Sequence, residues 1–133
     1  MIEAVSAILV CECAVFAIKR QPHLRAFPGY HAFPGGKIEA SDHKDSAELS
    51  APFSLPAAHF AALQRELLEE LAFDLSAALT RGEIQSIELF GEAVTPAFEA
   101  LRFTAHYYKI VLQQRPSFEL EDNEVQSADW NTP

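Results

Sequence analysis

The sequence predicts a single α/β (α+β) domain in which a mixed β-sheet packs against helices. Two stretches near the N-terminus are rich in Val, Ile, Phe and Cys, which favours strands over helix. The middle of the chain carries the strongest helical periodicity, and two further strand-like stretches follow it. This order, with antiparallel hairpins expected, is typical of a mixed sheet covered by helices.

The first two strands are predicted at Ala4–Val10 and Ala14–Lys19, with a turn near Glu12. Residues 21–36 contain three prolines and three glycines and are therefore predicted to be a loop or a chain of turns. Residues 43–55 have no clear hydrophobic period and few apolar anchors. We expect a mobile surface insertion there.

Pro56 opens the central helix, because proline suits the first turn of a helix. The apolar stripe of this helix has spacings of 3, 4 and 4 and consists of Phe60, Leu63, Leu67 and Leu71. After a short helical or loop segment, residues 86–94 and 101–113 are predicted strands. Residues 116–124 are acidic and turn-like.

Composition and charge narrow the class of partner. Of the 133 residues, 49% are hydrophobic and 22% are charged, as in soluble globular proteins. Asp and Glu number 19 against 10 Lys and Arg, a net charge of −9. Such a surface repels nucleic-acid phosphates and anionic membranes. We therefore expect a small-molecule ligand, no nucleic-acid or membrane partner, and a monomer or homodimer.

The chain also suggests a compartment. No apolar run approaches the roughly 20 residues that span a bilayer, and no basic region precedes an apolar stretch at the N-terminus. Cys11 and Cys13 share a face of the predicted strand region and make neither a metal knuckle nor a disulfide framework. We expect a cytoplasmic protein with reduced thiols.

Three glutamates of the central helix carry the first chemical signal. On a helical wheel Glu66, Glu69 and Glu70 fall within roughly an 80° arc, opposite much of the leucine stripe, so we expect an exposed face. Like charges at these spacings destabilise a helix. The cluster is therefore either a solvated acidic face or a site for a hard divalent cation such as Mg²⁺.

The context of these acids favours the cation site. The helix carries Arg65-Glu66-Leu67-Leu68-Glu69-Glu70, and Phe33-Pro34-Gly35-Gly36-Lys37 stands upstream. Together they resemble the Nudix box, G-x5-E-x7-R-E-U-x-E-E-x-G-U, where U is a bulky apolar residue. Three positions depart from it. Asp42 replaces the first Glu, 22 residues instead of seven separate Asp42 from Arg65, and Ala72 replaces the last Gly.

A wider resemblance points to one branch of that family. Arg20, Arg25 and Gly29, followed by Phe33-Pro34-Gly35-Gly36, are similar to the R-S-x3-R-x3-G-x3-F-P-G-G signature of coenzyme A diphosphatases, with Gln21 in place of Ser. Val94-Thr95-Pro96, Arg102-Phe103 and Tyr107-Tyr108 resemble the peroxisomal-type branch, which also carries an insertion inside its box. Glu124-Val125 ahead of Trp130 is similar to an element near the end of the Nudix fold.

The resemblance implies an α/β/α sandwich with a mixed sheet, and hydrolysis of a nucleoside diphosphate linked to another moiety, with coenzyme A or its derivatives as candidates. It implies a Mg²⁺ (or Mn²⁺) ion held by Glu66, Glu69, Glu70 and the Gly36 carbonyl. Arg65 would orient a carboxylate. Glu66, or a loop acid such as Glu124 or Glu121, would activate water. The residues implied in substrate binding are Arg20, Arg25, Gly35 and Lys37.

A second reading of the same motif is a non-catalytic Nudix-like nucleotide-binding or regulatory module of a larger protein. The interrupted box could displace the metal loop, and the chain ends at Pro133, where the family continues into a last helix. We therefore expect that a C-terminal helix is missing and that this is the N-terminal domain of a longer protein. The intact R-E-U-x-E-E core argues for activity.

Overall fold

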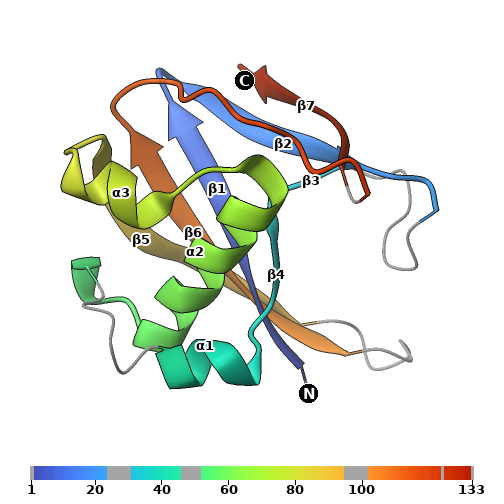
Figure 1. Ribbon diagram of the computed structural model, residues 1–133, viewed down its shortest axis with the longest axis vertical. Helices are drawn as coiled ribbons and strands as arrows, with labels where there is room; N and C mark the ends of the chain where they lie inside the picture. The colour runs from blue at the N-terminus through green and yellow to red at the C-terminus, as the bar shows by residue number, and fades with distance from the viewer. Residues whose placement is uncertain (1, 24–30, 46–51, 95–101, 124, 133) are drawn as a thin grey trace.

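The computed structural model describes residues 2–23, 31–45, 52–94, 102–123 and 125–132 (Figure 1). The strands are β1 (Ile2–Cys11), β2 (Ala14–Arg20), β3 (His31–Ala32), β4 (Gly35–Lys37), β5 (Ile84–Val94), β6 (Phe103–Leu112) and β7 (Val125–Asn131). The helices are α1 (Ala40–Asp45), the short 3₁₀ turn η1 (Pro52–Ser54), α2 (Ala57–Leu71) and α3 (Leu75–Thr80).

The strands form one seven-stranded mixed sheet with the path β3-β2-β1-β6-β5. β1 lies parallel to β6, with Val5 opposite His106, and antiparallel to β2 and β4. β7 pairs with β2, and β5 pairs with β6, both in antiparallel fashion. Helices pack against this sheet, which confirms the predicted fold class.

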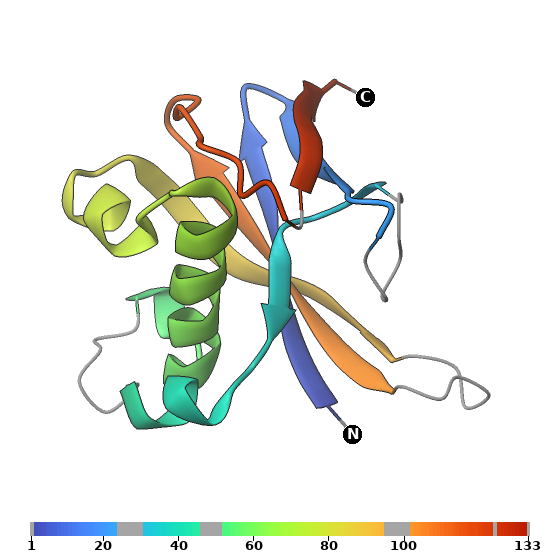
Figure 2. The same ribbon diagram turned by 45° about the vertical axis from the view of Figure 1, so that its right-hand side comes forward.

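The helices gather on the same side of the sheet in both views (Figures 1 and 2). α2 follows Pro56 and covers the sheet with the predicted apolar stripe. All four residues of that stripe are at most 2% exposed: Phe60, Leu63, Leu67 and Leu71. Opposite them, sheet residues such as Val5, Leu9 and Ile110 are fully buried. Burial on this scale is the main contribution to the stability of such a domain.

The long strands were predicted within two residues at either end, whereas three others were not predicted. β3 and β4 have two and three residues, too few to display alternation. β7 contains Gln, Ser and Asp, but its Val125, Ala128 and Trp130 point to the interior side. The residues of β7 that lie away from the core, among them Gln126, Ser127 and Asp129, are exposed, as in an antiparallel pair with one face in solvent.

Part of the segment expected as an insertion, residues 46–51, lies outside the described residues. At its start, residues 43–45 complete α1; at its end, Leu55 is buried in the core while Phe53 is 48% exposed. The cysteines do not share a face, because Glu12 and Cys13 form the β1–β2 turn, leaving Cys11 buried and Cys13 exposed. Within the described ranges, no helix has the length and apolar character needed to cross a lipid bilayer.

Candidate active site

β4 brings two glycines between the central strand β1 and the acidic side of α2. Gly35 lies opposite Ser6 of β1, and its N–H donates a hydrogen bond of 3.1 Å to Glu70 Oε2. A Cβ at Gly35 would lie 2.1 Å from the Val5 carbonyl oxygen, which is main chain and cannot swing aside. Glycine at this position therefore permits the close contact between β4 and β1 that fixes Glu70.

Gly36 faces the other direction, toward α2. A Cβ at this position would lie 2.5 Å from the Glu66 carboxylate carbon and from its Oε1. The carboxylate thus occupies the volume that any larger residue would need. One glycine of the pair makes room for the backbone of β1, and the other makes room for Glu66.

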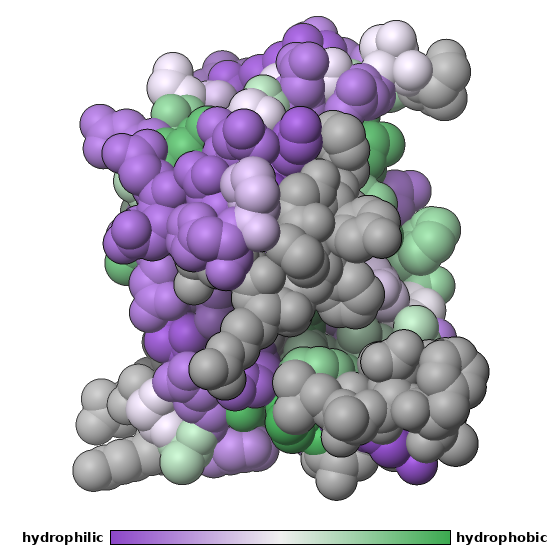
Figure 3. Space-filling model, turned by 90° about the vertical axis from the view of Figure 1, so that its right-hand side faces the viewer, coloured by the Kyte–Doolittle hydropathy of each residue, from purple (hydrophilic) through white to green (hydrophobic). Residues whose placement is uncertain are grey.

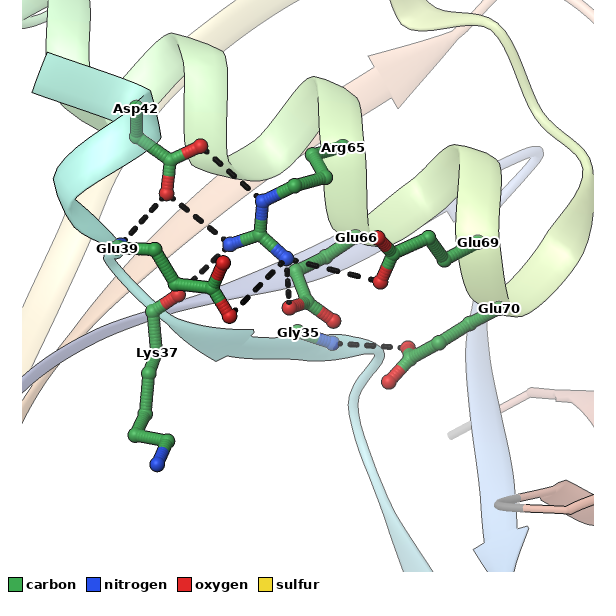
Figure 4. A network of polar contacts seen from close by, with 8 residues as sticks. All are labelled: Gly35, Lys37, Glu39, Asp42, Arg65, Glu66, Glu69 and Glu70. Carbon is green, nitrogen blue, oxygen red and sulfur yellow. Dashed lines mark hydrogen bonds and ion pairs between the residues drawn. The ribbon is translucent and has the colours of Figure 1, made fainter. Parts of the chain in front are cut away.

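Arg65 is the centre of the polar cluster (Figure 4). Its guanidinium donates to Glu66 Oε1 at 2.6 Å and to the Lys37 carbonyl at 2.8 Å. Four carboxylates lie within 4 Å of its nitrogens: Glu39 at 3.9 Å, Asp42 at 3.0 Å, Glu66 at 2.6 Å and Glu69 at 3.6 Å. The hydrogen bond to Asp42 is the main cause of the raised Arg65 pKa, so Arg65 stays charged. One positive charge is shared among four negative ones.

Asp42 links the start of α1 to this cluster. Its Oδ2 accepts a hydrogen bond from the Glu39 N–H at 2.7 Å. Asp42 is the third residue of α1, and its side chain caps the N-terminus of the helix as in a capping box. Arg65 donates to both of its oxygens, at 3.1 and 3.0 Å. Burial opposes ionisation of this 2% exposed carboxyl, but the Arg65 and Glu39 contacts outweigh it and lower its pKa.

The three helix glutamates do not share the exposed face that the helical wheel predicts. Glu70 is 2% exposed and Glu66 9%, whereas the Glu69 side chain is 61% exposed. The expectation was wrong for the two buried residues, because the wheel considers α2 alone. β4 covers this side of the helix, and its glycines allow the carboxylates to lie against it.

Residues 119–121 hold the C-terminal end of α2. The N–H groups of Glu119 and Glu121 donate to the Leu71 and Glu70 carbonyls, both at 2.9 Å. This contact brings the Glu121 backbone next to the buried Glu70. The candidate base Glu124 lies outside the described residues.

Ala72 ends α2 in the left-handed region, with φ 54° and ψ 32°. Its N–H bonds the Leu68 carbonyl at 3.0 Å, and the next N–H bonds that of Leu67. This is the position where the box resemblance expects glycine. Ala72 therefore has a positive φ, at which alanine carries a strain cost of about 1 kcal/mol.

Of the residues implied in substrate binding that the structure describes, Gly35 and Lys37 lie on β4 and Arg20 lies on β2. Lys37 has an exposed side chain that extends away from Arg65 (Figure 4). Arg20 ends β2 opposite Val125, and the next side chain, Gln21, donates to the Asp122 carbonyl at 2.8 Å. Arg20 therefore lies beside the segment that contacts the end of α2. Arg25 is outside the described residues.

Glu39 belongs to the cluster but was not among the residues predicted for the site. It stands three residues before Asp42, and its carboxylate reaches Arg65. The signal was the lead-in Gly-Gly-Lys-Ile-Glu itself, which places a carboxylate at the start of α1.

Hydrophilic residues dominate the described part of the face shown in Figure 3.

No protein-family model and no curated protein matches the sequence. Solved structures do match. A NUDIX hydrolase from Alicyclobacillus acidocaldarius is similar with a TM-score of 0.78 and 20% identity, over 98% of this chain and 78% of that one. The chain has the Nudix fold.

Two other solved structures are also similar to this chain. The C. elegans Ap4A hydrolase, solved as a binary complex, has a TM-score of 0.67 and 13% identity over 99% of this chain and 80% of that one. A bifunctional NMN adenylyltransferase/ADP ribose pyrophosphatase from Francisella tularensis, complexed with AMP and a Mn ion, has a TM-score of 0.63 and 18% identity. That match covers 98% of this chain and 34% of the other.

Proposed function

We propose that this domain is a Mg²⁺-dependent hydrolase that cleaves the diphosphate bond of a nucleoside diphosphate linked to another moiety. The observation that carries the proposal is the fixed pair of buried carboxylates. Glu66 is held by Arg65, and Glu70 by the Gly35 N–H. Charged groups are buried in this way only where they are paired or bind a metal. Glu69, on the same helix, adds an exposed third carboxylate.

The donor set fits a hard divalent cation. Carboxylate oxygens are the ligands Mg²⁺ takes from proteins, together with water and substrate phosphate. The four carboxylates around Arg65 leave a large excess of negative charge, and Glu70 adds to it. Since Gly36 has no Cβ, the Glu66 carboxylate can lie directly against β4. Glu66, Glu69 and Glu70 would hold the ion, and the Gly36 carbonyl would complete its coordination.

When bound, Mg²⁺ neutralises charge on the diphosphate oxygens and lowers the pKa of a coordinated water. The chain's own residues supply position. Arg65 keeps Glu66 in one orientation through a 2.6 Å hydrogen bond and is itself fixed by Asp42. The proton of water is accepted by Glu66, by Glu121, whose N–H bonds the Glu70 carbonyl, or by Glu124.

For the substrate, we propose coenzyme A or a derivative as the first candidate. The support is the signature that begins at Arg20 and ends at Gly36. Arg20 lies at the end of β2, beside the segment that reaches Glu70. Two proteins of the same fold are named for hydrolysis of ADP-ribose and of a dinucleoside polyphosphate, so those compounds are the alternatives.

The test is hydrolysis of a panel consisting of coenzyme A, ADP-ribose, NADH and dinucleoside polyphosphates, each with Mg²⁺ and with EDTA. We expect Mg²⁺-dependent cleavage of the diphosphate bond, fastest with coenzyme A, which would release adenosine 3′,5′-bisphosphate and phosphopantetheine. Turnover of ADP-ribose alone would keep the reaction class and remove the coenzyme A assignment. Saturable nucleotide binding with no turnover would favour the non-catalytic binding module.

A further inference from the structure

A second cluster of metal-ligand residues lies at the opposite end of α2. Glu3 of β1, His59 of the first turn of α2 and His106 of β6 each place one ligand atom within 4.8 Å of the other two. Among the described residues this is the group of His, Cys, Asp and Glu side chains that meets that spacing. The parallel pairing of β1 with β6 brings Glu3 and His106 together across the sheet.

His106 lies between two carboxylates. Its Nδ1 is 3.2 Å from Glu92 Oε1, and its Nε2 is 3.2 Å from Glu3 Oε1. A neutral imidazole has one N–H, so it can donate to only one of them. The other contact then sets a nitrogen lone pair against a carboxylate oxygen, unless a second proton or a cation lies between them.

His59 completes the cluster from the helix side. Its Nδ1 lies 2.6 Å from the Tyr108 hydroxyl, and its ring centroid is 4.6 Å from that of His106. Burial, and then the neighbouring His106, lower the pKa of His59 in spite of the opposing charges of Glu3 and Glu92. A neutral imidazole is the form that binds metal ions.

We propose that Glu3, His59 and His106 form a binding site for a Zn²⁺-like transition-metal ion. Zn²⁺ binds imidazole nitrogen and carboxylate oxygen at about 2.0–2.2 Å, so ligand atoms of a tetrahedral site lie about 3.3–3.5 Å apart. The separation of 3.2 Å between Glu3 Oε1 and His106 Nε2 is about 0.1 Å below this spacing. Glu92 on Nδ1 is the outer carboxylate that commonly orients a metal-binding histidine.

This site differs from the carboxylate cluster in its position on α2 and in the metal ion that it favours. His59 precedes Glu66 by about two helical turns, or about 10 Å along the axis of α2. Imidazole ligands favour Zn²⁺ and related ions, whereas an all-carboxylate set suits Mg²⁺. Because its ligands come from β1, β6 and α2, the ion would join the first turn of α2 to the centre of the sheet. This inference does not rest on the proposed hydrolase activity.

The test is Zn²⁺ titration of the untagged protein by calorimetry, in excess Mg²⁺ to occupy the carboxylate cluster. We expect one Zn²⁺ per chain and a raised melting temperature, because the ion binds the folded state. Glu92→Gln is expected to weaken binding by about 10–100-fold, as for other outer partners of metal ligands. His59→Gln and His106→Gln are expected to weaken it more. His23→Gln, an exposed histidine after β2, is the matched control and leaves binding unchanged.

A second measurement needs no mutation. Imidazole NMR resonances of the wild-type protein are followed during the same titration, and two histidines are expected to shift at a stoichiometry of one. Absence of Zn²⁺ binding in excess Mg²⁺, equal affinity in the His59 and His106 variants, or shifts confined to other histidines would each overturn the proposal. In that case His106 is a structural link between Glu3 and Glu92.

Discussion

Arg65 donates hydrogen bonds of 3.1 and 3.0 Å to the two carboxylate oxygens of Asp42, a residue 23 positions earlier in the chain. The contact joins the two halves of the interrupted motif. α1 and α2 pack together on either side of it, so the extra residues do not separate the Gly-Gly strand from the acidic helix. The shorter Asp in place of Glu still reaches the guanidinium.

We expect Asp42→Asn to destabilise the fold by about 1.5–3 kcal/mol at neutral pH, because it removes the charge-assisted hydrogen bonds between Asp42 and Arg65. The pKa of Asp42 is lowered in the folded state. Its stabilising effect is therefore present above the ordinary Asp pKa and is lost as the pH falls through the folded value. Urea unfolding from pH 7 to pH 3 measures this. A wild-type-to-variant difference that stays constant over that range would contradict it.

Gly36→Ala tests the fit between β4 and Glu66. The added Cβ must displace the Glu66 carboxylate, which is the far end of a flexible side chain. We expect a stability loss under about 1.5 kcal/mol and an activity loss of about 100-fold, the scale of a 1 Å misplacement. Gly91→Ala, where a Cβ meets nothing within 4 Å, is the control. Full activity of Gly36→Ala would show that the position of Glu66 is not critical.

Ala72→Gly is expected to stabilise the protein by about 1 kcal/mol, because Ala72 is held at positive φ. The same substitution at Ala58, in the first turn of α2, is expected to destabilise by up to about 1 kcal/mol. Thermal melts of the two variants measure the contrast. A lower melting temperature for Ala72→Gly would mean that the left-handed conformation carries no strain.

Arg25→Ala addresses substrate choice. We expect it to reduce kcat/KM for coenzyme A more than for dephospho-coenzyme A, by about 1.5–3 kcal/mol, the value of a hydrogen bond to a charged group. The physical reason is that a 3′-phosphate dianion needs a local cation in a chain of net charge −9. Equal losses on the two substrates would remove this role and favour an ADP-ribose-type or dinucleotide substrate.

The parts of the fold that repeat a period could be predicted from the sequence. The stripe from Phe60 to Leu71 located α2, and apolar stretches located β1, β2, β5 and β6. β3, β4 and β7 were missed because pairing partners far along the chain define them. Two or three residues, or a polar strand, carry no periodic signal of their own.

The candidate site, too, could be predicted from the sequence only in part. The spacing of Arg65, Glu66, Glu69 and Glu70 made them candidates, and the structure brings Glu66 and Glu69 to Arg65. Their burial was not predictable, because it depends on β4 lying over α2. The cluster of Glu3, His59 and His106 had no sequence signal, since its residues meet only through the β1–β6 pairing and the packing of α2.

The most direct test of the proposed hydrolase is Mg²⁺-dependent turnover by Glu69→Gln beside the wild-type protein, with each melting temperature recorded. The Glu69 side chain is 61% exposed, and its carboxylate comes no closer than 3.6 Å to Arg65. Exposed ion pairs of this kind contribute little to stability, so the substitution should leave the fold nearly unchanged. We expect Mg²⁺-dependent diphosphate cleavage by the wild type and a loss of about 100-fold or more in the variant, because it removes one ligand charge of the proposed metal site. Wild-type turnover in the folded Glu69→Gln variant, or cleavage that persists in EDTA, would contradict it.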